Sequence, residues 1–353
     1  MGMVFLGQVA VSRDNNLNLI RMIAAFAVLV SHAWPIALGP QAVQPLKALT
    51  GQTLGTLSVW VFFAISGYLI TLSFVRTDDV PRFVLARARR LVPGLIVSVI
   101  LVAFVIGPIV TTLPLAAYLS DPATGSFLWR NVLMAMPQFH LPGVFETQPY
   151  TDVVGSIWTL FYEVLCYVGV LIVGMMGLLH KRRAMAVGVV IYAVAWLSMT
   201  GTGLHPKLTA LHQLSLPFII GMAFYLWRDR VPLHGAIAVL GFLPAILLHN
   251  TVCAVPAFVI AISYATFWLA YVPGGVIRAY NKVGDYSYGL YIYAFPLQGL
   301  AVWLVPGQGP WLNIAIATPL TLICAVASWH VVERPAMEGR FRLSPTAALR
   351  PHG

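Results

Sequence analysis

The chain has 353 residues, of which 59% are hydrophobic and only 9% are charged. A soluble globular domain carries a charge on about a quarter of its residues, so this composition excludes an ordinary soluble enzyme and indicates a protein with many membrane-spanning helices. The formal net charge of +10 raises the alternative of nucleic-acid binding, but the positions of the basic residues favour a membrane protein and no nucleic-acid partner.

Ten apolar segments have or approach the length of about 20 residues that a membrane-spanning helix needs. We therefore predict an all-α fold, a polytopic membrane bundle of about ten transmembrane helices that forms a single domain over residues 1–353. The predicted spans are 17–37, 55–75, 92–111, 154–178, 184–200, 210–227, 233–249, 253–272, 286–305 and 311–332.

The basic residues in the connections predict the orientation of these spans, because lysine and arginine are retained on the cytoplasmic side. With the N-terminus in the cytoplasm, 17 of the 21 basic residues lie on the inner side. Lys47, Arg130 and Lys207 lie on the outer side, and Arg21 lies within a span. Both termini are therefore predicted to be cytoplasmic.

The first span, which reads NLIRMIAAFAVLVSHAW, holds two ionisable residues, Arg21 and His32. They are 11 residues apart, which brings them within about 20° of the same helix face with a rise of about 16 Å. Ionisable residues inside a span normally face the bundle interior and mark a functional site. Two simpler interpretations stay open: Arg21 reaches a lipid phosphate, and His32 bonds to a neighbouring helix.

A cluster of arginines precedes the third span, in the stretch FVLARARRLVPGL. Such clusters usually set orientation. Arg87 and Arg90, however, are three residues apart and share a helix face. Two guanidinium groups at one helix start suit phosphate or pyrophosphate oxygens.

The largest predicted outer connection covers about residues 112–153. Its stretch FLWRNVLMAM, from Phe127 to Met136, is expected to form a short helix at the membrane interface. A connection this long in a compact bundle is more often functional than idle.

Glu163 is the one acidic residue well inside a predicted span. Its expected depth of about 10 Å from the outer end of the fourth span resembles that of His32. We therefore predict that the two side chains meet, either as a structural hydrogen bond or as a catalytic base with its orienting carboxylate.

The inner end of the last span reads WHVVERPAM. Glu333 is expected to pair with an inner arginine. His330 and Glu333 form an H-x-x-E pattern, which is half of a dimetal motif, but the sequence has no second copy, so no metal is predicted. The serine of FFAISGYL lacks the glycine spacing of a hydrolase elbow, G-x-S-x-G.

In order along the chain, these stretches resemble the acyltransferase-3 family of integral-membrane acyltransferases, which includes bacterial O-antigen and exopolysaccharide O-acetyltransferases. The matching motifs are the Arg21–His32 pair, FFAISGYL, the Arg87–Arg90–Pro93 pattern, IWTLFYE, YSYGLYIYAFP and VVERP. Two departures stand out. Ala294 replaces a histidine of many members, and the soluble C-terminal domain of some members is not expected here.

The resemblance implies an O-acyltransferase of the bacterial inner membrane. Its donor would be acyl-CoA, usually acetyl-CoA, bound from the cytoplasm with help from Arg21, Arg87 and Arg90. His32 would be the catalytic centre, and the acceptor would be a hydroxyl of a carbohydrate or glycolipid beside membrane lipid. From the rise between Arg21 and His32 we add the hypothesis that the 112–153 connection holds this acceptor. We assign Glu163 as the residue that orients His32. Direct transfer and an acyl-histidine intermediate both stay open.

Two other functions remain as alternatives. A multi-span secondary transporter or lipid-linked sugar flippase also suits ten spans with internal charges, although transporters often show paired halves with interrupted helices, and no such pairing is visible. A non-enzymatic membrane scaffold or sensor would not require the set of Arg21, His32 and Glu163.

Overall fold

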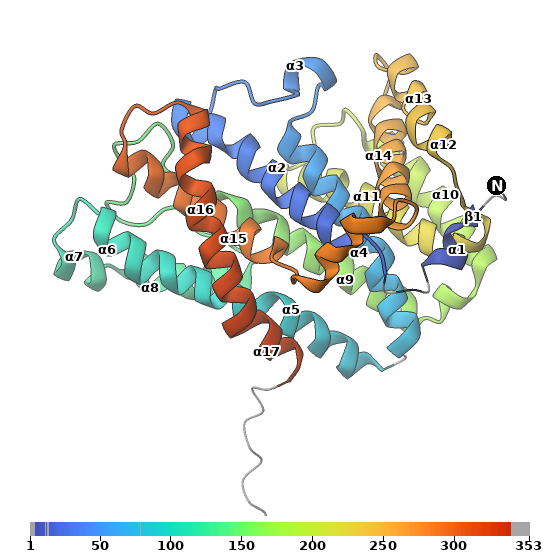
Figure 1. Cartoon of the computed structure of the whole chain (residues 1–353), viewed down its shortest axis with the longest axis horizontal. Helices are drawn as coiled ribbons and strands as arrows, with labels where there is room; N and C mark the ends of the chain where they lie inside the picture. Colours follow the sequence, from blue (N-terminus) through green and yellow to red (C-terminus); the bar gives the residue numbers. More distant parts are fainter. Residues whose placement is uncertain (1–3, 11, 13, 78, 340–353) are drawn as a thin grey trace, which may run out of the picture.

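A computed structural model describes residues 4–10, 12, 14–77 and 79–339, and they form a bundle of helices (Figure 1). The longer helices are α2 (Leu17–Leu38), α4 (Leu54–Thr77), α5 (Val80–Leu101), α9 (Trp158–Met175), α10 (Arg182–Met199), α11 (Pro206–Leu226), α14 (Ala254–Tyr271), α15 (Ser287–Leu304) and α16 (Pro310–Ser328). The predicted all-α fold is confirmed.

Shorter elements connect these helices. The short α-helices are α1 (Leu6–Val9), α3 (Lys47–Thr50), α6 (Gly107–Val110), α7 (Leu115–Ser120), α8 (Pro122–Leu133), α12 (Gly235–Leu240), α13 (Leu243–Leu247) and α17 (Arg334–Met337). The 3₁₀ segments are Gly155–Ile157, Leu178–His180, Arg228–Arg230 and Gly275–Lys282, and the π-helical turns are Val102–Ile106 and Trp329–Glu333. β1 (Val4–Phe5) and β2 (Pro232–Leu233) form one antiparallel pair.

Eight helices of the described residues are long and apolar enough to cross a membrane, against about ten predicted. They are α2, α4, α5 with its continuation to Val110, Gly155–Met175, α10, α11, α14 and α16 with its continuation to Met337. The predicted span 233–249 is instead two short helices, α12 and α13, because the chain turns at Gly241–Phe242 and Pro244 lies in the first turn of the next helix.

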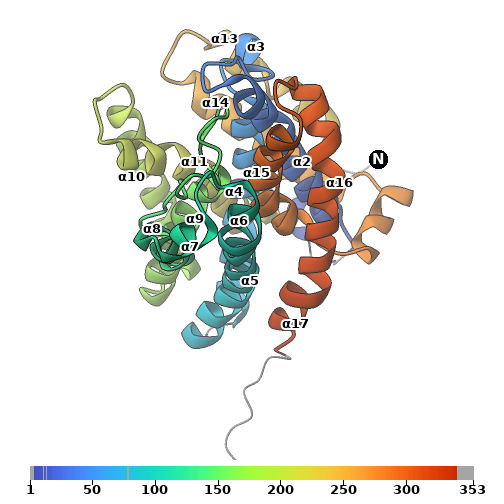
Figure 2. The ribbon, with the colours of Figure 1, turned by 90° about the vertical axis from the view of Figure 1, so that its left-hand side faces the viewer.

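α15 is the other predicted span that falls outside this set, and it occupies the core of the bundle. Every residue from Ser287 to Gly299 is buried. α15 packs against α2 and α16, and the three helices lie close together in Figures 1 and 2. Its tyrosines and Gln298 lower its hydropathy, and they are satisfied by other helices; for example, Gln298 donates to the carbonyl of Leu29 at 2.9 Å.

α4 and α11 cross at two glycines. A Cβ on Gly67 would overlap the carbonyl oxygen of Phe218, and a Cβ on Gly221 would overlap that of Ala64. Small residues allow this close approach between membrane helices. The glycine of the FFAISGYL motif therefore sets the distance between α4 and α11.

The segment 112–153 differs from the predicted outer connection. Its helix α8 begins at Pro122, five residues earlier than expected, and packs along α5. The Tyr118 hydroxyl donates to the carbonyl of Ala103 at 2.7 Å, and Met134 reaches a cavity that Val84 and Arg87 line near the start of α5. The segment thus descends along the side of the bundle, and Tyr118 of α7 and Phe127 of α8 are fully buried there.

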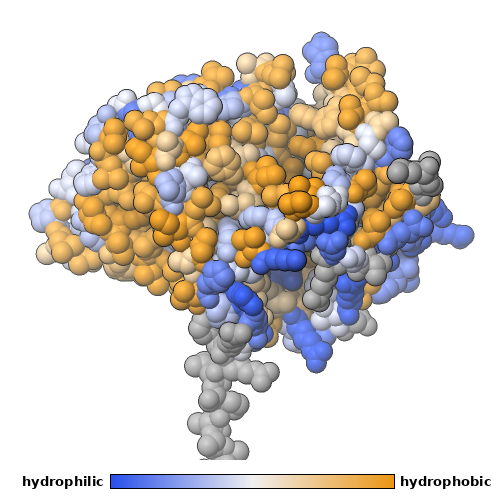
Figure 3. Space-filling model, in the orientation of Figure 1, coloured by the Kyte–Doolittle hydropathy of each residue, from blue (hydrophilic) through white to orange (hydrophobic). Residues whose placement is uncertain are grey.

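Apolar side chains cover most of the face seen in Figure 3, and hydrophilic side chains gather toward the end that carries α17 and the start of α5. This polarity matches the predicted inner side. Arg13, Arg340, Arg342 and Arg350, which the orientation also counted, lie outside the described residues.

Candidate active site

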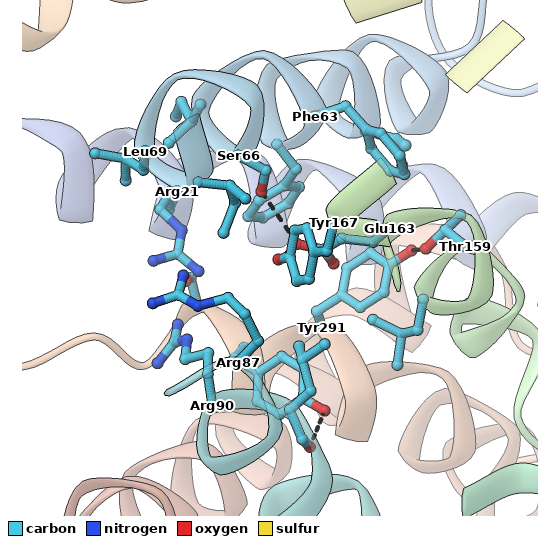
Figure 4. A pocket seen from close by; sticks show the side chains of 18 of the residues that line it. Arg21, Phe63, Ser66, Leu69, Arg87, Arg90, Thr159, Glu163, Tyr167 and Tyr291 are labelled. Carbon is cyan, nitrogen blue, oxygen red and sulfur yellow. Dashed lines mark hydrogen bonds between the residues drawn. The ribbon is translucent and has the colours of Figure 1, made fainter. Parts of the chain in front are cut away.

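A cavity of about 150 Å³ lies inside the bundle and brings together four sequence-predicted residues, Arg21, Arg87, Arg90 and Glu163. The three arginines stand side by side at one end of this inner cavity (Figure 4). Thr159 and Tyr291 lie at the opposite end. The predicted grouping of these arginines is therefore present in the structure.

Asp285 holds two of the arginines together. Its Oδ2 atom is 2.5 Å from Nη1 of Arg21 and 2.6 Å from Nη2 of Arg90. The Ser287 hydroxyl donates to Oδ1 of the same carboxylate at 2.5 Å. α2, α5 and the start of α15 thus meet at one buried acid, and Arg21 is held inside the protein and does not need a lipid phosphate as its partner.

The charges around Asp285 also set its protonation. Burial alone would raise the pKa of the Asp285 carboxyl, but Arg21 and Arg90 outweigh burial and lower this pKa to about 2. The carboxylate is therefore charged at neutral pH, and one of the three positive charges of the arginine cluster is neutralised.

Arg87 differs from its two neighbours because it makes no hydrogen bond or ion pair with any described residue. Its buried Nε atom has no partner. A buried polar group without a partner is uncommon and calls for an explanation. The guanidinium faces the cavity and is free to bind an anion.

Glu333 reaches the same cluster from the π-helical turn that ends the last span. It is 1% exposed, and its Oε2 atom lies 3.9 Å from Nη1 of Arg90. The two groups form an ion pair, but the distance is too long for a hydrogen bond. The other carboxylate oxygen, Oε1, accepts a hydrogen bond from the Ser328 hydroxyl at 2.8 Å. The predicted pairing with an inner arginine is confirmed, with Asp285 the nearer partner of Arg90. His330 lies apart from it, 3.1 Å from the hydroxyl of Tyr286.

Glu163 lies in the middle of the inner cavity (Figure 4). Its Oε1 atom accepts hydrogen bonds from the hydroxyls of Ser66, at 3.1 Å, and Tyr167. Ser66 is the serine of FFAISGYL. α4 and α9 are thus joined by one carboxylate.

His32 lines a second cavity of about 180 Å³, the outer cavity. Its ring packs edge-on against Phe295 at 5.3 Å between centroids, and its buried Nδ1 atom has no hydrogen-bond partner. His32 and Arg21 both face the bundle interior, as the helix period of α2 predicts, but they open into different cavities.

The predicted contact between His32 and Glu163 is wrong. Glu163 faces the inner cavity and bonds to Ser66 and Tyr167. The two cavities share Val59, Thr159 and Tyr291, and the Thr159 and Tyr291 hydroxyls lie 2.6 Å apart. Glu163 lies one helical turn after Thr159 on α9. Its side chain is therefore on the inner-cavity side of this junction.

The outer cavity is formed without the predicted outer connection. Its walls come from residues 44–60 at the start of α4, from the starts of α9 and α11, and from α2 and α15. No residue of the 112–153 segment lines it.

Three residues of the site, Asp285, Tyr291 and Thr159, were not predicted from the sequence. Asp285 lies one residue before a predicted span, a position where an acid looks like an ordinary residue of a connection. Tyr291 belongs to YSYGLYIYAFP and Thr159 to IWTLFYE, but no single-chain pattern indicates that they meet.

Comparison with known proteins identifies the family of this chain. A family model described as an acyltransferase domain covers residues 14–330. The chain belongs to the acyltransferase-3 family. It is similar to an O-acetyl transferase of Shigella phage Sf6, with 27% identity over 96% of this chain and 99% of that protein. It is also similar to Nodulation protein 10 of Rhizobium leguminosarum bv. viciae, with 25% identity over 93% of this chain and 95% of that protein.

No solved structure matches the chain. Membership of the acyltransferase-3 family makes the protein an acyltransferase, and its apolar helices make it an integral membrane protein. The motifs that suggested the family contribute to both cavities: Arg21 and Glu163 to the inner one, and His32 to the outer one. Ala294, where many members carry a histidine, is packed in the core against α2 and α16.

Proposed function

We propose that this protein is a membrane O-acetyltransferase that moves an acetyl group from cytoplasmic acetyl-CoA to a hydroxyl of a carbohydrate. One observation carries the proposal: an inner cavity with three arginines and an outer cavity with His32 abut at the Thr159–Tyr291 junction. The relative from Shigella phage Sf6, which is named an O-acetyl transferase, supports acetyl as the group transferred.

The inner cavity is the proposed donor site. Coenzyme A carries phosphates at its nucleotide end and a thioester at the end of a long flexible arm. Arginines bind phosphate oxygens through paired N–H groups. Asp285 fixes Arg21 and Arg90 in place, and Arg87 has a free guanidinium. The arm would extend from this cluster past Glu163 toward the junction.

His32 is the proposed catalytic residue. Its imidazole takes the proton of the acceptor hydroxyl, the oxygen attacks the thioester carbon, and the carbon–sulfur bond breaks. The departing thiolate takes the proton and leaves as free coenzyme A. In the second route, the imidazole first takes the acetyl group and then passes it to the acceptor. Both routes need the same ring, which is unpaired at Nδ1.

Glu163 has a different proposed role from the one that its sequence position suggested. Because it bonds to Ser66 and Tyr167 and not to His32, it acts as a positioning residue of the donor path. It keeps the Tyr167 ring and the Ser66 hydroxyl in place between the arginines and the junction.

The test is acetyl transfer from radiolabelled acetyl-CoA in membranes that carry His32→Ala. Loss of a general base costs about 100-fold to 10,000-fold in rate, and we expect a loss in that range. His249→Ala is the matched control, because His249 is exposed and bonds only within its own turn. A correctly inserted His32→Ala protein with full transfer would contradict the proposal.

A further inference from the structure

The outer cavity carries polar groups but almost no charge. The structure lines it with Val28, His32, Gln44, Thr53, Gly55, Thr56, Val59, Trp60, Trp158, Thr159, Gln213, Leu214 and Tyr291. This set contains no aspartate, glutamate, lysine or arginine. The inner cavity, by contrast, holds three arginines and Glu163. The two sides of the junction are therefore built for ligands of different charge.

A charged ligand is costly to hold in the outer cavity. Moving an ion out of water without a counter-charge costs several kcal/mol even after the protein relaxes. His32 is the one ring that a proton makes cationic here, and the proposed chemistry needs it as a base. A carboxylate on the acceptor would bind the protonated ring and remove that base.

Three side chains at this cavity have hydrogen-bonding groups that no described residue occupies. Gln44 accepts from the Ser31 hydroxyl at 2.7 Å through Oε1, which fixes its amide and leaves Nε2 free. The Gln213 amide and the Trp158 indole N–H make no hydrogen bond to the described residues. Amides and an indole offer donors and acceptors without charge, which matches the hydroxyls of a sugar ring.

Trp158 adds an apolar surface to these polar groups. It is 38% exposed and lines the cavity at the start of α9, with its ring edge-on to Tyr162 at 5.7 Å. A broad aromatic face beside hydrogen-bonding groups suits a ring that is apolar on its faces and polar at its edge. A pyranose has this character, and an open-chain polyol does not.

We infer that the outer cavity recognises an uncharged sugar ring, with Gln44, Gln213 and Trp158 as the residues that determine specificity. This inference rests on the proposed function and names the class of its acceptor. Gln213 is exposed and makes no internal bond, so its replacement does not disturb the fold.

The experiment uses the full-length protein in vesicles, with acetyl-CoA and pairs of oligosaccharides. The two members of each pair differ only at the terminal ring, which is glucose in one and glucuronic acid in the other. The wild type is expected to acetylate the neutral member faster. Gln213→Ala and Gln44→Ala are expected to raise the KM for the neutral acceptor by about fivefold to tenfold, which corresponds to one lost hydrogen bond. The KM for acetyl-CoA is expected to stay unchanged.

Two variants make the test sharper. Gln213→Arg supplies the missing counter-charge, so it is expected to shift the preference toward the glucuronic acid member. Gln41→Ala is the matched control, because Gln41 lies exposed in the same connection but does not line the cavity. It is expected to behave as the wild type.

Equal or faster acetylation of the acidic members by the wild type would overturn the inference. The inference would also be overturned if the Gln213 and Gln44 variants changed the KM for acetyl-CoA and left the KM for the acceptor unchanged. Absence of any thioester consumption with every acceptor would instead contradict the proposed function, and the inference with it. Acetyl transfer to at least one member of a pair therefore distinguishes a failure of the inference from a failure of the proposed function.

Discussion

At the scale of single residues, Asp285 organises the arginine cluster of the inner cavity. It is buried, it contacts two guanidinium groups, and Ser287 completes its hydrogen bonding. Removing one partner of a buried ion pair leaves the other charge uncompensated, which costs more than the pair itself contributes. The arginine cluster therefore depends on this acid for its geometry as well as for its charge.

We predict that Asp285→Asn lowers the free energy of unfolding by about 3–5 kcal/mol and raises the KM for acetyl-CoA. Thermal unfolding in detergent and donor kinetics measure the two effects. The control is Asp229→Asn. Asp229 also bonds to an arginine, Arg182, at 2.7 Å, but both side chains are about half exposed. A surface pair contributes about 0–1 kcal/mol, so equal effects of the two substitutions would contradict this account.

The pH dependence follows from the same residue. The pKa of Asp285 is about 2 in the folded protein and about 3.9 in an unfolded chain. Its stabilising effect is therefore complete above about pH 4 and is lost as the pH falls toward 2. The difference in stability between wild type and Asp285→Asn should shrink over that range, as unfolding measured at a series of pH values would show.

The residues also show what sequence alone can predict. Arg21 and His32 face the interior because 22 residues of α2 form one uninterrupted helix, and Arg87 and Arg90 share a face for the same reason. The partners of Glu163 depend on tertiary packing. Tyr167 lies one turn further along α9, so its contact with Glu163 is predictable from their spacing of four residues. Ser66 comes from a different helix, and its contact with Glu163 could not be predicted.

At the scale of helices, the crossing of α4 and α11 fixes the wall of the inner cavity. Both glycines of this crossing, Gly67 and Gly221, meet a backbone carbonyl of the other helix. A backbone cannot move aside as a flexible side chain does, so the packing tolerates no extra methyl group there. Ser66 lies next to this contact, and its hydrogen bond to Glu163 depends on the same spacing.

We predict that Gly67→Ala destabilises the protein by about 1–3 kcal/mol, because an added methyl group overpacks the crossing. Gly169→Ala is the matched control, since Gly169 also lies within a long helix but has nothing within 4 Å of an added Cβ. There, alanine should stabilise the helix by about 0.5–1 kcal/mol. Thermal unfolding distinguishes the two variants. Similar melting temperatures for Gly67→Ala and Gly169→Ala would show that the α4–α11 crossing has room for an added methyl group.

Helix boundaries were predictable where apolar runs are long and unbroken, as in α2 and α4. The span 233–249 was not, because hydropathy does not register the turn at Gly241–Phe242. The path of α8 was also hidden. Its descent along α5 depends on the hydroxyl of Tyr118 and on the space beside Gly107, which are long-range contacts.

At the scale of the whole molecule, the two cavities differ in charge: the inner cavity holds three arginines and Glu163, and the outer cavity holds none of these residue types. α2 runs through both, with Arg21 in one and His32 in the other. In the function that we propose, the donor binds in the inner cavity, the acceptor binds in the outer cavity, and the two meet at the Thr159–Tyr291 junction. The acetyl group would then cross the membrane core while coenzyme A stays on the cytoplasmic side.

The most direct test of this claim uses sealed right-side-out vesicles that contain the protein. Acetyl-CoA is enclosed inside, and the neutral oligosaccharide is added only outside. We expect acetyl ester on the outer oligosaccharide, formed at the expense of the enclosed thioester and abolished in His32→Ala. Product that forms only when both substrates are placed on the same side would contradict it.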